Sequence, residues 1–166
     1  MSGPAKRKHI SPKKRQEVWE KYNGHCAYCG CEITLKEMQV DHAEAIYPHE
    51  KEYKAGQADY LDSIENYMPA CRMCNFYKST STIEGFRKNL QTLTDRLEKL
   101  FIYRLAKKYG IVKEYDKQII FYFEKTENQK QITAAESKIK DKLLQYKAEL
   151  EKQTQYKSGL PGSALD

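Results

Sequence analysis

Paired cysteines offer the clearest chemistry in this sequence. Cys26 and Cys29 form one CxxC pair, and Cys71 and Cys74 form a second. Two such pairs supply the four thiolates of a tetrahedral zinc site, and four thiolates leave the metal no open position for a substrate. The segment between the pairs is longer than the roughly 15 to 20 residues of a common paired site, so a sizeable insert separates them. We therefore predict one structural Zn²⁺ on these four cysteines, with Cys31 as the less favourable alternative to Cys29.

Polar residues in and after the insert suggest a second kind of chemistry. His42 suits deprotonation of water near neutral pH, because an imidazole has an unperturbed pKa of about 6.5. Asp41 and Asn75 offer oxygen ligands for Mg²⁺ or Mn²⁺. Asn75 and Lys78 share a helix face in the expected register, which would place a phosphate-neutralising cation beside the metal ligand. Asn66 is expected to hold the His42 ring through a hydrogen bond. Together these residues predict phosphodiester hydrolysis with one divalent ion.

Short elements must position these side chains. Ser11 and Pro12 begin a predicted helix that runs to Tyr22 and stops at Asn23-Gly24. A short strand over 38–40 leads into Asp41 and His42, and a second strand over 66–70 precedes a helix over 71–80. Neighbouring strand residues face opposite sides, so we expect the Asp-His pair at a strand end. Residues 43–65 are expected to form a long, largely acidic loop.

The second half of the chain is predicted to be mainly helical. Apolar residues at spacings of three and four over 82–108 predict one amphipathic helix whose apolar stripe belongs to the core. Residues 118–123 are β-branched and aromatic and predict a strand. Residues 131–156 are polar with sparse apolar positions, which predicts a helix that is exposed or packed on a partner. The last residues, SGLPGSALD, are expected to be disordered.

Composition narrows the class of protein. The chain has 166 residues with a formal net charge of +6. Basic residues dominate segments 1–21 and 66–115, which favours attraction to a polyanion such as nucleic acid. No window approaches the roughly 18 to 20 apolar residues of a membrane span, and the basic N-terminus lacks the apolar run of a secretory signal. We expect a cytoplasmic protein with reduced cysteines and no membrane association.

The motifs CAYCG, QVDH, EN and CRMCNFYK resemble those of HNH endonucleases, the ββα-metal nucleases, in the zinc-ribbon subgroup of phage and bacterial members. The resemblance extends from about residue 13 to residue 125. It implies that His42 is the general base, that Asp41 and Asn75 hold the catalytic metal, and that Asn66 supports the base. Asn75 stands where many members have histidine, an HNN variant similar to members that favour Mg²⁺.

The expected fold is therefore α+β. A small ββα-metal core is braced by the four-cysteine zinc ribbon and flanked by helices, among them a long amphipathic one. The expected organisation is a basic N-terminal arm and helix start over 1–21, the nuclease core with its zinc knuckles over 22–90, a packing helix and terminal strand over 91–125, and a polar helical extension with its tail over 126–166.

The expected function is a metal-dependent DNA endonuclease that nicks one strand per active site. Double-stranded DNA is the expected substrate, a second copy or a phage packaging component the expected protein partner, and the bacterial host cytoplasm the location if a phage encodes the chain. The alternatives are a non-catalytic zinc-ribbon module that binds nucleic acid and an interaction protein that docks through 131–156. His9, His25 and His49 are poorer catalytic candidates than His42.

Overall fold

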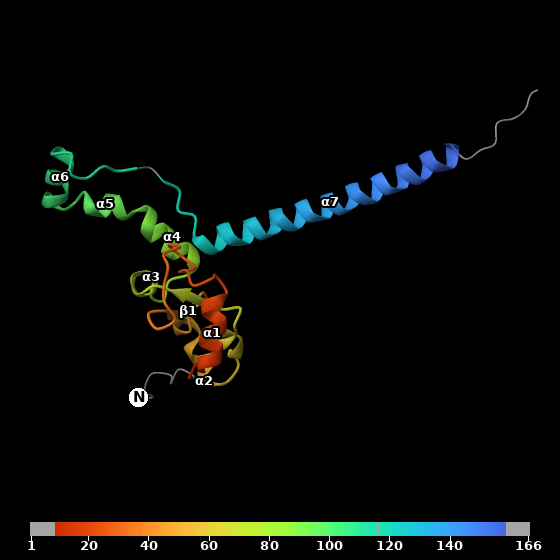
Figure 1. Cartoon of the computed structure of the whole chain (residues 1–166). Helices are drawn as coiled ribbons and strands as arrows, with labels where there is room; N and C mark the ends of the chain where they lie inside the picture. Colours follow the sequence, from red (N-terminus) through yellow and green to blue (C-terminus); the bar gives the residue numbers. More distant parts are fainter. Residues whose placement is uncertain (1–8, 116, 159–166) are drawn as a thin grey trace, which may run out of the picture. The chain divides into compact units, whose positions relative to one another are not determined.

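A computed structural model of the chain describes residues 9–115 and 117–158. The chain divides into two compact units, residues 1–125 and 126–166. The structure mixes helices with one two-stranded sheet, as an α+β class requires. In chain order, the elements of the first unit are α1 (Pro12–Glu20), β1 (Gln39–His42), the 3-10 turn η1 (Tyr47–His49), α2 (Glu50–Lys54), the 3-10 turn η2 (Asp59–Asp62), β2 (Tyr67–Ala70), α3 (Arg72–Lys78), α4 (Ile83–Gln91), α5 (Leu93–Leu97) and α6 (Phe101–Lys108) (Figure 1).

Helix α1 begins where the sequence predicts, but it ends at Glu20, two residues before the expected end at Tyr22. The Ser11 side chain accepts a hydrogen bond from the Lys14 amide, and Pro12 occupies the first turn. The chain then leaves the helix through Asn23 and Gly24, whose φ angles are 51° and 72°. A Cβ at Gly24 would lie 2.7 Å from the Trp19 ring, so glycine is needed there for space as well as for conformation.

The sheet and the helix behind it are also as predicted. β1 pairs antiparallel with β2, so that Asp41 lies opposite Met68 and His42 lies opposite Tyr67. Pro69 lacks an amide hydrogen, which a two-stranded sheet tolerates because each strand is an edge strand. Cys71 caps α3, which therefore follows β2 without an intervening loop. β1, β2 and α3 thus carry the candidate residues, with η1, α2 and η2 between the two strands.

The larger of two apolar clusters in the described residues holds these elements together. Tyr28 lies near its centre, with its ring centroid 5.4 Å from Phe86 and 5.5 Å from Phe121, both in edge-on contacts. The fully buried members of this core include Val18, Cys26, Ala27, Ala70 and Phe86. The core thus joins α1, the first cysteine pair, β2, α4 and the chain just before the last helix.

The acidic segment between the strands is more ordered than the predicted loop. It contains η1, α2 and η2, and it has an apolar cluster of its own. Tyr53, Ala58 and Leu61 are buried there, and Ile46 packs against them. Apolar residues in this segment show no sustained helical spacing, because each helical piece is only three to five residues long. The prediction of a loop over 43–65 was therefore wrong.

The predicted single helix over 82–108 is also corrected, because three helices stand in its place. Two side chains donate to backbone carbonyls near the first break: Thr92 Oγ1 donates to the Lys88 carbonyl at 3.0 Å, and the Arg96 guanidinium donates to the Asn89 carbonyl. At the second break the backbone itself leaves the helical conformation. Leu100 is extended, with φ −86° and ψ 125°. Only the first part of the apolar stripe is core, since Phe86 is buried whereas Leu100 and Phe101 are exposed.

Residues 118–123 do not form the predicted strand. Phe121 is buried in the core, and the last helix, α7 (Tyr122–Ser158), begins directly after it. The Glu124 carboxylate accepts a hydrogen bond from the Phe121 amide at 2.8 Å, which favours a helix start over a strand. Arg87 of α4 contacts both the Ile119 carbonyl and Glu124, so this segment is tied to α4 instead of to a sheet.

The second unit consists of α7 as far as the chain is described. This confirms the helix expected over 131–156, and the apolar side chains of Ile132, Ile139, Leu143 and Leu144 are exposed on it. The predicted disordered tail lies, apart from its first residue, outside the described residues. Of the helices in the described ranges, none has both the length and the apolar composition needed to cross a membrane.

Candidate active site and metal centre

The two CxxC pairs come together into one cluster. The Sγ atoms of Cys26, Cys29, Cys71 and Cys74 all lie within 4.8 Å of one another, and those of Cys29 and Cys71 are 3.9 Å apart. Four thiolates at about 2.3 Å from a tetrahedral zinc ion would be separated by about 3.8 Å. The donor set and its spacing therefore fit a structural zinc site. The cluster includes Cys29 and not Cys31, as the sequence favoured.

Local backbone geometry builds each half of the cluster. Gly30 has φ 77°, and its amide donates to the Cys26 carbonyl at 2.9 Å, which closes the first turn. A Cβ at Gly30 would lie 2.8 Å from the Tyr122 ring, so a larger residue would displace the start of α7. In the second half, the Cys71 Sγ accepts the Cys74 amide at the first turn of α3. The cluster is therefore anchored at the N-terminus of α3.

Proton sharing within the cluster favours one thiolate before any metal binds. A hydrogen bond from the Cys74 thiol lowers the pKa of Cys26 to about 4, although burial opposes the change. The same hydrogen bond, together with burial, raises the pKa of Cys74. A thiolate is the form that binds metal, so a cation would bind Cys26 directly and release protons from the other thiols.

Tyr28 connects the first cysteine pair to the second group of candidate residues. It lies between Cys26 and Cys29, and its hydroxyl donates a hydrogen bond to Oδ2 of Asp41. Burial raises the pKa of Tyr28, and the Asp41 charge and hydrogen bond raise it further, so the hydroxyl keeps its proton for this contact. The cysteine cluster thereby helps to position Asp41, a contact that no sequence motif indicated.

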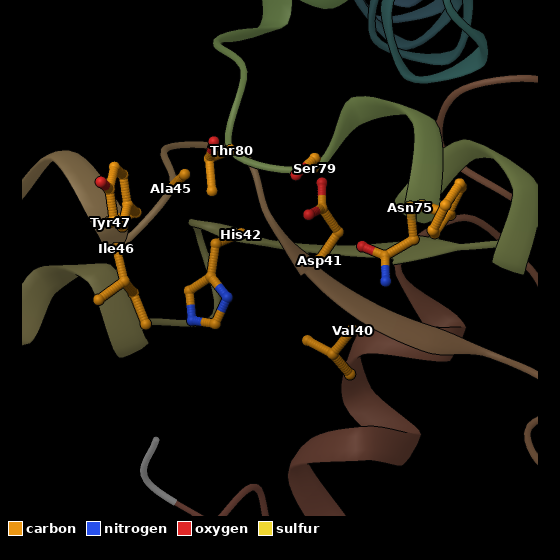
Figure 2. Close-up of a pocket in the computed structure, with 10 residues that line it drawn as sticks. Val40, Asp41, His42, Ala45, Ile46, Tyr47, Asn75, Ser79 and Thr80 are labelled. Carbon is orange, nitrogen blue, oxygen red and sulfur yellow. The ribbon is translucent and has the colours of Figure 1, made fainter. Parts of the chain in front are cut away.

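An open pocket with a volume of about 280 Å³ lies at the end of β1. Asp41 and His42 border it from β1, and Asn75 borders it from α3 (Figure 2). Figure 2 shows the Asp41 carboxylate and the His42 ring extending to opposite sides of the strand, as neighbouring strand positions must. β1 ends at His42, which confirms the expected place of the pair. Ser79, with a strained φ of 50°, is a further pocket residue that the sequence did not indicate.

Lys78 does not have the role predicted from its spacing. Its side chain is fully buried, and Nζ lies 3.0 Å from Oδ2 of Asp41 and 2.8 Å from the His42 carbonyl, to which it donates. It is therefore the ion-pair partner of Asp41 and cannot reach a phosphate in the pocket. The predicted helical spacing does place Lys78 near Asn75. The Lys78 side chain, however, extends toward β1, where it contacts Asp41 and His42. Because Oδ2 takes both contacts, Oδ1 is the Asp41 oxygen left for a ligand.

Asn75 is oriented by a neighbour on β1. Its Nδ2 donates to Oε1 of Gln39 at 2.6 Å, so the amide oxygen faces the other way. Figure 2 shows this side chain pointing toward Asp41. One carboxylate oxygen and one amide oxygen on the same pocket are chemically suited to a hard divalent cation, with the remaining positions left to water and to an anionic ligand.

Asn66 does not contact the His42 ring, contrary to the prediction. Its Oδ1 accepts the Glu44 amide at 2.8 Å, and its Nδ2 donates to the carbonyls of Glu44 and Leu61 at 3.0 and 2.9 Å. These bonds tie the start of the 43–65 segment to its end. Asn66 therefore shapes the segment next to the pocket, while the ring has other partners.

The partners of His42 are an aspartate and a tyrosine. Nε2 of His42 lies 3.3 Å from Oδ1 of Asp62, and the imidazole and the Tyr67 ring pack edge-to-face with centroids 5.1 Å apart. Asp62 also accepts hydrogen bonds from the hydroxyls of Tyr53 at 2.6 Å and Tyr67 at 3.1 Å. Sequence reasoning missed Asp62 because it is one of many acidic residues in a segment without a motif.

His9, His25 and His49 do not line this pocket. Nε2 of His49 is 2.8 Å from the Glu44 carboxylate, and the His25 ring stacks on Tyr122 with centroids 5.3 Å apart. Among the described residues, His42 is therefore the histidine that borders the pocket.

Comparison with protein-family models and with curated proteins gives no match to this chain. What the chain does is accordingly inferred from its own residues.

Proposed function

We propose that this protein is a metal-dependent endonuclease of the HNH type that hydrolyses phosphodiester bonds in DNA. One observation carries the proposal: Asp41, His42 and Asn75 border one open pocket. These are the base and the two oxygen ligands that the motifs QVDH and CRMCNFYK suggest. The cysteine cluster supports the arrangement, because it contacts Asp41 through Tyr28 and begins the helix that bears Asn75.

Each residue has a defined task in the proposed reaction. His42 accepts a proton from a water molecule as the water oxygen attacks phosphorus, and the bond from phosphorus to the 3′ oxygen breaks. Oδ1 of Asp41 and the amide oxygen of Asn75 would hold Mg²⁺ or Mn²⁺. The ion, when bound, offsets negative charge on the phosphate and on the departing oxygen. The leaving oxygen takes its proton from solvent.

Charge at the pocket suggests how tightly the ion is held. Lys78 pairs with Asp41, so the only carboxylate among the two proposed ligands is already neutralised. A site with two protein oxygens and little net charge holds a divalent ion weakly, and a substrate phosphate would complete the coordination. We therefore expect nicking to need millimolar concentrations of the divalent metal, and the bound ion to dissociate readily.

One proposed catalytic pocket in the described part of the chain has a consequence for the product. A single base and a single ion site cleave one strand, so a monomer should nick duplex DNA. Cleavage of both strands in one encounter would need a second copy of the chain.

The test is a nicking assay on supercoiled plasmid at low salt, with purified protein whose zinc content is measured in every variant. Wild type is assayed with Mg²⁺, with Mn²⁺ and without added divalent metal. His42→Ala and Asn75→Ala should lose nicking, by a factor of about 100 or more for the base, while keeping zinc. His49→Ala is the matched control, because it removes an imidazole that does not line the pocket.

Metal-dependent nicking that is lost in both pocket variants and kept in the control would support the proposal. Wild-type protein that binds plasmid with full zinc but cuts it in no metal would contradict it. That second result would favour a non-catalytic zinc module, for which the buried Lys78–Asp41 pair already gives a structural reason to retain both residues.

A further inference from the structure

We infer that Asp62 is the positioning residue of His42. It holds the imidazole so that Nε2 carries the proton and Nδ1 is left as the basic nitrogen. The catalytic consequence rests on the proposed function, whereas the tautomer is a property of the folded protein whether or not it cleaves DNA.

The contact between the two side chains is enclosed. The side chains of His42 and Asp62 are 14% and 10% exposed, and Nε2 lies 3.3 Å from Oδ1. The Tyr67 ring packs against the imidazole and limits its rotation. Figure 2 shows the two ring nitrogens of His42 on opposite edges, so the contact of Nε2 with Asp62 leaves Nδ1 on the other edge of a ring that borders the pocket.

The hydrogen bonds that Asp62 accepts indicate which nitrogen of His42 holds the proton. Asp62 accepts from the hydroxyls of Tyr53 and Tyr67. Burial by itself would raise the pKa of Asp62, but the hydrogen bonds from Tyr53, His42 and Tyr67 outweigh it and lower the pKa. An ionised carboxylate has no proton to donate, so the proton in the contact belongs to Nε2 of His42. In the neutral ring Nδ1 then carries the lone pair that a general base needs.

The 43–65 segment is built to hold Asp62 in this place. Asp62 ends η2, one residue after the fully buried Leu61. Asn66 donates to the Leu61 carbonyl, and Tyr53 reaches Asp62 from α2. The insert between the cysteine pairs therefore has a purpose beyond spacing, since it delivers the carboxylate that orients the base.

The first measurement is the tautomer of His42, read from two-bond proton–nitrogen correlations of the imidazole in mildly alkaline buffer. The chain has four histidines, and a His42→Gln variant assigns the signal. Wild type should show the proton on Nε2. In Asp62→Asn a single amide oxygen must serve two tyrosine hydroxyls and the ring, so a substantial fraction of His42 should carry the proton on Nδ1 instead.

The second measurement is plasmid nicking by the same variants. Asp62→Asn should lower kcat by about 100-fold with little change in KM, because a misoriented base affects the chemical step. Asp59→Asn makes the same charge change at an exposed position of η2 and should match wild type in both readouts. If Asp62→Asn does not fold, Asp62→Glu keeps the charge and should keep the Nε2 proton while still reducing kcat.

The outcomes separate this inference from the proposed function. Folded Asp62→Asn with the wild-type tautomer and the wild-type rate would overturn the role of Asp62. A wild-type ring with its proton on Nδ1 would overturn it as well. If the tautomer shifts as expected but wild type never cuts DNA, the positioning contact stands and only the nuclease proposal fails.

Discussion

Replacing Lys78 with methionine tests whether this lysine is structural. Methionine keeps the unbranched apolar stem and removes the ammonium group, so packing changes little. Asp41 is only 6% exposed, and in the variant the Tyr28 hydroxyl would be its remaining described partner. The variant should fold less stably, although a surface lysine replaced in the same way would have almost no effect.

The expected size follows from the geometry. The ammonium lies 3.0 Å from Asp41 Oδ2, and at an effective dielectric constant of about 20 such a pair attracts by about 5.5 kcal/mol. The hydrogen bond to the His42 carbonyl at 2.8 Å is lost as well. Relief of the desolvation of Lys78 offsets part of this, so we expect the free energy of unfolding to fall by about 3 to 5 kcal/mol.

Urea unfolding followed by circular dichroism measures this change. With a slope of about 2 kcal/mol per molar urea, the midpoint should fall by roughly 2 M. Lys88→Met on the exposed side of α4 is the matched control and should stay within about 0.5 kcal/mol of wild type. Adding Asp41→Asn to Lys78→Met should recover part of the loss, because no buried charge is then unpaired. A Lys78→Met variant as stable as Lys88→Met would refute a buried ion pair.

Two further predictions concern the cysteine cluster and the contact between α4 and α7. Cys71→Ser should lose bound zinc and unfold more readily, whereas Cys31→Ser should keep one zinc per chain by mass spectrometry of the native protein; equal zinc content in both would contradict the assigned ligands. Burial would raise the pKa of Glu124, but the hydrogen bonds from Arg87 and from the Phe121 amide lower it. The stabilisation that ionised Glu124 contributes is therefore complete above the unfolded pKa of about 4.3, and it is lost as the pH falls through the lower pKa of the folded state. Glu124→Gln should therefore flatten the decline of stability between about pH 5 and pH 3, and an unchanged acid transition would contradict this.

Features that depend on neighbouring residues could be predicted from the sequence. The start of α1 follows from Ser11 and Pro12, and the two halves of the cysteine cluster follow from the CxxC spacing. The two strands and α3 are short, but turn residues and paired cysteines bound them closely. These predictions succeeded because the determining contacts span only three or four residues.

Features that depend on distant contacts were predicted less well. The apolar period over 82–108 is real, yet it does not show that the helix breaks at Thr92 and again before Phe101, where Leu100 is extended. The strand propensity of 118–123 was overridden because Phe121 packs in the core and Glu124 caps a helix. For 118–123, local preference lost to burial and to a side-chain hydrogen bond.

The sequence alone determined which residues offer metal ligands and which offer acid–base groups, because that chemistry depends on residue type and local spacing. Only the tertiary structure decided their roles. Lys78 is buried against Asp41, Asn66 ties its own segment together, and Asp62 reaches His42 from twenty residues away. The physical reason is that hydrogen bonds and ion pairs act over a few ångströms, and only the fold brings distant residues that close.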